Sequence, residues 1–251
     1  MADVFTRTRR LIGDEGLALL GRSRVVVIGL GGVGSFATEA LARAGIGHFV
    51  LIDFDDVDIT NVNRQLHAFP DTVGLSKVEL MRERVLRINP QADVIALKRF
   101  VSGDDAGEIL AEPCDYVVDA CDTVSVKVAF AVCCARLGVP IISSMGAGNR
   151  LDPTRFRVAD ISRTHTCPLA RAVRQGLRRA GVASGLTVVF SDEKPRRGED
   201  GAGGGGGEGP GGPGSISFVP PVAGLILAGV VVNDLLRFHG LEGADLRDGR
   251  G

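Results

Sequence analysis

The sequence predicts an α/β protein with a doubly wound, mostly parallel sheet, and three observations lead to this expectation. Apolar runs without strict alternation recur along residues 1–149, as in parallel strands that are buried on both faces. Helical patterns lie between these runs, and a glycine-rich turn directly follows the first of them. Alternating strands and helices are typical of a sheet that carries helices on both faces.

The first 149 residues give the elements in a regular order. We expect strands at Val25–Leu30, Phe49–Asp53, Val94–Leu97, Tyr116–Asp119 and Ile141–Ser144. We expect helices at Ser35–Ala44, Lys77–Ile88 and Val124–Leu137. The second helix ends before Asn89-Pro90 and the third ends at Gly138, and both are ordinary helix stops.

The pattern changes after Asn149. We expect a strand at Phe156–Ile161, a basic helix at Pro168–Ala180 and a strand at Leu186–Phe190. Residues 195–214 are rich in glycine and have no side chains that could form a core, so they predict a flexible loop. Residues 215–239 contain an apolar helix, Pro221–Arg237, that we expect to close the core or an oligomer interface. The apolar stretch here is interrupted by prolines and is too short to predict membrane insertion.

Composition and charge fit one domain that spans residues 1–251. The chain is 45% hydrophobic and 24% charged, with a net charge of −1. Residues 150–197 hold 11 Lys and Arg against 4 Asp and Glu, so a basic segment, residues 150–194, is expected on the substrate side of residues 1–149. The five cysteines include no CxxC pair, which argues against a zinc knuckle or a disulfide framework and favours reduced thiols in a cytoplasmic protein.

The glycine-rich turn predicts a phosphate site. Gly29, Gly31 and Gly34 form a GxGxxG pattern after a strand and at a helix start, so Val25–Asp53 reads as a Rossmann-type βαβ unit. Glycine lets backbone N–H groups approach a phosphate, although the same turn could simply pack the helix on the strand. Asp53 can accept hydrogen bonds from a ribose, so this unit alone fits NAD, FAD or ATP.

The following segment favours ATP. Arg64 and Lys77 form a cationic pair that a dinucleotide does not need, whereas the pair could neutralise the charge on departing pyrophosphate. Asp122, just beyond the strand Tyr116–Asp119, is well placed to hold Mg²⁺. Solvated surface charge is the alternative for either cation alone.

Four motifs in this order resemble a known superfamily. GLGGVGS, DxDxVxxxNxNRQ, GLSK and DACD resemble the ubiquitin-activating-enzyme-like (ThiF/MoeB-type) proteins, which adenylate a carboxylate with Mg-ATP. The tracts RQLHAFPDTVGLSKVELMRERVLRINP and SSMGAGNRLDPTRFRVADISRT, with PLA after Cys167, are most similar to the tRNA threonylcarbamoyladenosine dehydratases within that superfamily.

The resemblance implies roles for individual residues. Catalytic roles fall to Arg10, Arg64, Lys77 and Asp122, the last as the Mg²⁺ ligand. The nucleotide-binding set is expected to comprise Gly29, Gly31, Gly32, Gly34, Asp53, Asp55, Asn61, Arg64 and Lys77. Arg10 resembles an arginine that reaches into the ATP site of a partner subunit, which implies a homodimer.

The implied function is ATP-dependent cyclisation of the threonylcarbamoyl group on a modified adenosine of tRNA, through adenylation of the threonyl carboxylate. The basic helix agrees with a tRNA substrate, since it carries Arg171, Arg174, Arg178 and Arg179. A sulfur-relay protein is a further possible partner. Cys167 is either a thioester nucleophile or a small buried residue.

Two other functions stay open at this point. The first is adenylation of the C-terminal glycine of a ubiquitin-like sulfur carrier, although such enzymes typically carry two CxxC pairs that are absent here. The second is a nucleotide-sensing module without catalysis. Arg64, Lys77 and Asp122 argue against the second function, because a sensor does not need to handle pyrophosphate.

Overall fold

A seven-stranded sheet forms the centre of the computed structural model, which describes residues 3–196 and 213–247. The strand order is β3-β2-β1-β4-β5-β7-β6, and only β6 runs antiparallel to its neighbour. The strands are β1 (Arg24–Ile28), β2 (His48–Asp53), β3 (Asp93–Lys98), β4 (Tyr116–Asp119), β5 (Ile141–Ser144), β6 (Phe156–Asp160) and β7 (Thr187–Ser191). The predicted doubly wound, mostly parallel sheet is therefore confirmed.

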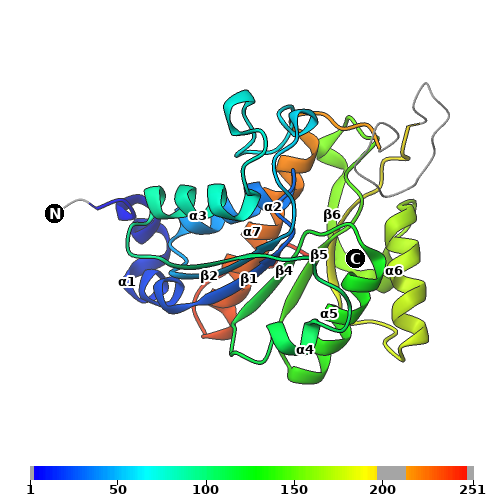
Figure 1. Cartoon of the computed structure of the whole chain (residues 1–251). Helices are drawn as coiled ribbons and strands as arrows, with labels where there is room; N and C mark the ends of the chain where they lie inside the picture. The colour runs from blue at the N-terminus through cyan, green and yellow to red at the C-terminus, as the bar shows by residue number, and fades with distance from the viewer. Residues whose placement is uncertain (1–2, 197–212, 248–251) are drawn as a thin grey trace.

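Helices cover both faces of the sheet (Figure 1). They are α1 (Thr6–Arg22), α2 (Gly34–Ala44), α3 (Lys77–Ile88), α4 (Ala106–Ile109), α5 (Val124–Leu137), α6 (Pro168–Arg179) and α7 (Val219–Phe238). Helices α2, α3 and α7 lie on one face, whereas α4 and α5 lie on the other, with α6 packed against α5. The Ile59–Asn61 segment forms a short 3₁₀ turn after β2.

The central strands are buried on both faces, which explains their continuous apolar runs. In β1, Val25 and Val27 belong to the core cluster under α2 and α7, whereas Val26 and Ile28 belong to the cluster under α4 and α5. The edge strand β3 differs from the prediction. Its residues alternate between exposed and half-buried, and Ile95 is 39% exposed, because α3 covers only the face of this edge strand that carries Val94 and Ala96.

The closing apolar helix is confirmed as α7, which begins two residues before the predicted start. By length and composition α7 could cross a membrane, but 67% of its apolar window is buried inside the structure, as in the core helix of a soluble protein. It packs so closely on α2 that a Cβ on Gly224 would lie 2.3 Å from the carbonyl oxygen of Val33. Most of the predicted glycine-rich loop, residues 197–212, lies outside the described residues.

Two helices were not predicted. Helix α1 contains three glycines and is kinked at Gly13, and it buries only Gly16, Leu19 and Leu20, so its sequence has no clear apolar stripe. Helix α4 is only four residues long. Strand β1 also ends two residues before the predicted end, because Gly29 adopts a positive φ of 85° that turns the chain out of the sheet.

The strand order predicts a ligand-binding crevice at the carboxyl ends of β1 and β4. These strands are neighbours, yet the helices that follow them, α2 and α5, pack on opposite faces of the sheet. Ligands of doubly wound sheets bind at such a reversal of strand order. The glycine turn follows β1 and the Asp122 loop follows β4, so both lie at this crevice.

Candidate active site

The glycines of the turn differ in how closely other atoms approach them. The N–H of Gly29 donates to the carbonyl of Ile52 over 2.8 Å, and a Cβ on Gly29 would lie 2.9 Å from the backbone nitrogen of Cys121. A Cβ on Gly31 would meet only the Nε2 atom of Gln65, 3.8 Å away. Gly29 therefore serves backbone packing, whereas Gly31 leaves an open backbone face beside a polar side chain.

Asp53 connects the end of β2 to the glycine turn through a hydrogen bond. Its Oδ2 atom accepts a hydrogen bond of 2.6 Å from the N–H of Leu30, and its Oδ1 atom accepts one of 2.9 Å from the N–H of Asp55. Burial raises the pKa of Asp53, and the Lys77 ammonium and these two amides act in the opposite direction. Each carboxylate oxygen has a further lone pair, so the carboxylate can still accept from a ribose hydroxyl.

Lys77 is a buried cation at the start of α3. Its side chain is 1% exposed, and Nζ donates to the Oδ2 atom of Asp55 over 2.8 Å. An ammonium this deeply buried needs charged and hydrogen-bonded partners. The ion pair therefore holds the Lys77 ammonium in place near Asp53 at the end of β2.

Asn61 and Arg64 build the turn that follows β2. The carbonyl oxygen of buried Asn61 accepts the N–H groups of Arg64 and Gln65, at 3.0 and 2.9 Å. The Nη1 atom of Arg64 donates to the carbonyl of Thr60 over 2.8 Å. A Cβ on Gly32 would lie 3.3 Å from Cγ of Arg64, so the Arg64 side chain lies against the glycine turn.

Asp122 presents an exposed carboxylate at the same crevice. It lies in the loop between β4 and α5, one residue after the Cys121 amide that packs on Gly29. Thr123 donates to its Oδ1 atom over 3.3 Å. Mg²⁺ in phosphate-handling sites is commonly held by one or two carboxylates together with the phosphates, so an accessible carboxylate here fits that ion.

Arg10 lies away from the other predicted site residues in the single chain. Helix α1, which carries it, packs at the amino ends of β1 and β2, where Leu17 lies 2.8 Å from a Cβ built on Gly45 after α2. Arg10 is exposed, whereas neighbouring Arg9 forms ion pairs with Asp3 and Asp14.

Comparison with known proteins identifies the family. The ThiF family model matches residues 5–245. The chain belongs to the ThiF family. This ThiF-family chain is 50% identical to the tRNA threonylcarbamoyladenosine dehydratase of Bacillus subtilis (strain 168) over 246 residues, 94% of this chain and 96% of that protein.

Solved structures agree with the family assignment. The E. coli tRNA N6-threonylcarbamoyladenosine dehydratase in complex with ATP matches this ThiF-family chain with a TM-score of 0.85 and 36% identity, over 94% of this chain and 95% of that chain. The molybdopterin-synthase adenylyltransferase of E. coli (strain K12) is 36% identical over 138 residues, which is 55% of this chain and 54% of that protein. The similarity to the adenylyltransferase thus covers a smaller part of the ThiF-family chain.

Sequence reasoning assigned no role to three buried polar side chains near the predicted site. The Oε1 atom of Gln65, both ring nitrogens of His67 and Oγ of Ser76 have no hydrogen-bond partner within the described part of the chain. Burial lowers the pKa of His67 to about 4, and the charges of Lys77 and Arg84 act in the same direction. Unsatisfied buried polar groups need a partner such as a ligand or water, so these atoms agree with a site that binds a polar molecule.

The cysteines are poorly suited to nucleophilic catalysis. Cys167 is 3% exposed in the apolar cluster beneath α6, which favours a structural role. Burial, followed by the charge of Asp119, raises the pKa of the Cys121 thiol well above its ordinary value. Cys167 is thus poorly accessible, and the raised pKa of Cys121 disfavours a thiolate at that residue.

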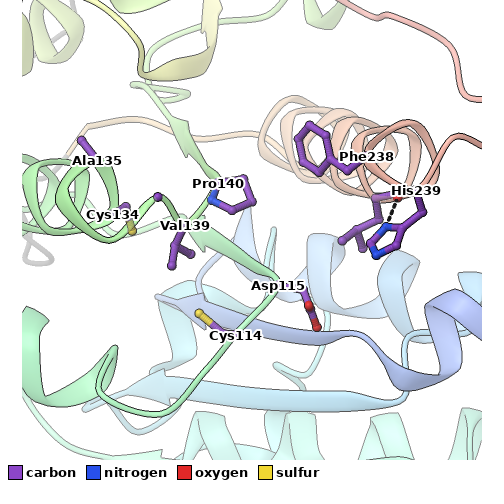
Figure 2. Close-up of a pocket in the computed structure, with 10 residues that line it drawn as sticks. Cys114, Asp115, Cys134, Ala135, Val139, Pro140, Phe238 and His239 are labelled. Atoms are coloured by element: carbon purple, nitrogen blue, oxygen red, sulfur yellow. Dashed lines mark hydrogen bonds between the residues drawn. The ribbon is translucent and has the colours of Figure 1, made fainter.

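A cavity of about 490 Å³ lies at the amino ends of β4 and β5, beside the end of α7 (Figure 2). Cys114, Cys134 and His239 are among its lining residues, and none of the predicted site residues line it. Burial raises the pKa of Cys114 to about 11, so this thiol is protonated near neutral pH. Among the described residues, no three His, Cys, Asp or Glu side chains are grouped to hold a metal ion. This cavity therefore has no evident chemistry.

Proposed function

We propose that this ThiF-family chain is an ATP-dependent tRNA threonylcarbamoyladenosine dehydratase. One observation supports the proposal: Asp53, Arg64 and the Cys121 amide next to Asp122 all lie against the glycine turn, and the buried Lys77–Asp55 pair lies beside Asp53. These are the groups that adenylation of a carboxylate requires. The relative that matches over 94% of this chain has that name, which supports the choice of substrate.

Each part of the site would hold a different part of ATP. Backbone N–H groups at Gly31 and Gly32, at the start of α2, would meet the phosphates with the positive end of the helix dipole. Asp53 would accept from the ribose. Arg64 and Lys77 would neutralise the charge that develops on pyrophosphate as it leaves. Asp122 would hold Mg²⁺, which supplies further neutralisation of phosphate charge.

The reaction then needs no nucleophile from the protein. A carboxylate oxygen of the threonyl group attacks the α-phosphorus of ATP, and pyrophosphate leaves. A nucleophile in the carbamoyl portion attacks the activated carbonyl carbon, loses its proton and closes a ring as AMP leaves with the original carboxylate oxygen. The net change in the tRNA base is the loss of one water. Positioning of this intramolecular attack can supply about 7–11 kcal/mol of the barrier.

Helix α6 is the proposed tRNA-binding surface. Arg171, Arg178 and Arg179 are exposed on it, whereas Arg174 donates to the carbonyl of Thr164 over 2.9 Å and so fixes the preceding loop. Exposed arginines on one helix suit phosphate contacts that position an RNA. In this assignment the chain is a single domain. Residues 1–149 bind the nucleotide, residues 150–194 face the tRNA, and residues 215–239 complete the core.

The same proposal includes a cytoplasmic homodimer. Arg10 would complete the ATP site of the partner subunit, which agrees with its position on the exposed N-terminal helix far from its own crevice. A sulfur-relay protein remains a candidate partner.

Two measurements test the function. Mass spectrometry of tRNA nucleosides after incubation with enzyme and Mg-ATP should show the threonylcarbamoyl base lighter by one water. ATP–pyrophosphate exchange should depend on tRNA that carries this base, with unmodified tRNA as the control. Exchange that instead requires a small ubiquitin-like protein would reject the proposal in favour of the sulfur-carrier adenylyltransferase.

A further inference from the structure

Lys127 is a charged residue in an otherwise apolar stretch of α5. Its side chain is 0% exposed, and its helix neighbours Val126, Phe130 and Ala131 are all buried in the core. Removing an ammonium from water is unfavourable, and well-packed apolar residues at such positions often stabilise a protein as well or better. Stability alone is therefore a poor reason for a lysine here.

The Lys127 ammonium has three acceptors, one for each of its N–H donors. Nζ lies 3.1 Å from Oδ2 of Asp119, 3.1 Å from Oγ of Ser143 and 2.8 Å from the carbonyl oxygen of Ser144. Ser143 in turn donates to the same Asp119 oxygen over 2.6 Å. Full satisfaction of the donors fixes the orientation of the carboxylate at the end of β4.

The second oxygen of Asp119 extends the network into the candidate active site. Oδ1 accepts from the N–H of Cys121 over 3.2 Å and lies 3.0 Å from its Sγ atom. The same Cys121 nitrogen lies against Gly29 of the glycine turn, and Asp122 is the next residue. Hydrogen bonds therefore link Lys127 through Asp119 to the backbone of Cys121, which contacts the glycine turn and directly precedes Asp122.

We propose that Lys127 is a positioning residue for adenylation, acting through Asp119 to fix the loop 120–123. The inference rests on the proposed function, since it assigns Asp122 to the Mg-ATP complex. A loop held in this way keeps the Asp122 carboxylate at a constant place relative to the glycine turn, and a displacement of about 1 Å at a reacting centre can cost a hundredfold in rate. Lys127 itself touches no substrate.

Matched variants separate positioning from stability. K127M leaves Asp119 buried without its cation, so it should lower the melting temperature as well as the exchange rate. K127M combined with D119L removes both charges and should recover most of the melting temperature. We expect ATP–pyrophosphate exchange in the double variant to stay about a hundredfold below that of the unaltered protein, mainly in kcat. K98M, which breaks the exposed Lys98–Asp56 pair, is the matched lysine control.

Calorimetric titration with ATP, with and without Mg²⁺, gives a readout that does not need tRNA turnover. The double variant should retain ATP affinity without Mg²⁺ and lose most of the gain in affinity that Mg²⁺ provides. If the double variant recovers both the melting temperature and that gain, Lys127 is only a structural residue and the inference is wrong.

The conservative variant S143A covers the case in which the charge-altering variants do not fold. It removes the hydroxyl that accepts from Lys127 and donates to Asp119, and a reduced Mg²⁺-dependent gain in ATP affinity in a variant that still unfolds cooperatively supports the inference. An unchanged gain overturns it. If the unaltered protein binds Mg-ATP but shows no tRNA-dependent exchange, the substrate assignment is wrong. The titration then still decides the role of Lys127.

Discussion

The α-carbon of Gly34 lies against the carbonyl oxygen of Gly29, so that a Cβ built on Gly34 would lie 1.8 Å from that oxygen. No real contact is that short, so a side chain at position 34 must move the start of α2 away from the glycine turn. The third glycine of the GxGxxG pattern is thus a packing requirement.

Two alanine variants separate the packing and ligand roles of the glycines. We expect G34A to lower the free energy of unfolding by about 1–3 kcal/mol, as overpacking does, and to weaken ATP binding. G31A should leave stability nearly unchanged, because its Cβ has room, but should obstruct the approach of a phosphate. Urea unfolding and ATP titration measure the two effects. Equal stability losses in both variants would contradict the division.

His67 should make stability depend on pH. The folded-state pKa of about 4 is below the ordinary 6.5, so the unfolded chain takes up a proton first as the pH falls. The stabilising effect is present above pH 6.5 and is lost between pH 6.5 and 4, amounting to about 3 kcal/mol.

Urea unfolding of H67F across this pH range should show a shallower fall in the free energy of unfolding than the unaltered protein. The difference in slope against pH should correspond to the uptake of up to about one proton. H165Q is the control, because the His165 side chain is exposed and its ring hydrogen-bonds only to the neutral Thr166 hydroxyl within the described residues. A pH dependence in H67F that equals that of the unaltered protein would show that other groups cause it.

Arg10 should act between subunits. In a heterodimer of one R10A and one R64A subunit, action across the interface leaves one intact site of two, so about half of the activity should return. The reciprocal heterodimer places both changes on one subunit and should be nearly inactive. Differently tagged subunits, purified through both tags, allow exchange assays on each species. The opposite pattern would place Arg10 in the site of its own chain.

The arginines of α6 should contribute to the salt dependence of tRNA binding. R171Q with R178Q should weaken binding and lower the slope of log affinity against log salt by about 2. Fluorescence anisotropy with a labelled anticodon stem-loop measures this slope. R22Q with R87Q removes two exposed arginines from α1 and α3 and should leave the slope unchanged. Equal effects of the two pairs would mean that net charge alone matters.

Much of the fold could be predicted because its signals are local. The bounds of α5, Val124–Leu137, and of β4, Tyr116–Asp119, agree with the sequence, since glycine and polar residues limit the apolar runs. Helix α1 could not be predicted, because its packing depends on α2 and α7 rather than on its own pattern.

The candidate site was predictable as a set of motifs, but not as a set of contacts. The spacing predicts a phosphate turn without showing that Gly29 packs on the chain and Gly31 faces outward. The Lys127 network was missed for a similar reason. Its acceptors Asp119 and Ser143 come from two strands, and only the sheet brings these strands together beneath α5.

Helix α7 follows the seven described strands in the chain, yet it fills the space against α2 and β5. A nascent chain that has completed β7 therefore still exposes the apolar groove that α7 later occupies, and such surfaces attract chaperones and proteases. A premature stop codon between β7 and α7 would for this reason produce a chain for degradation rather than a shortened enzyme.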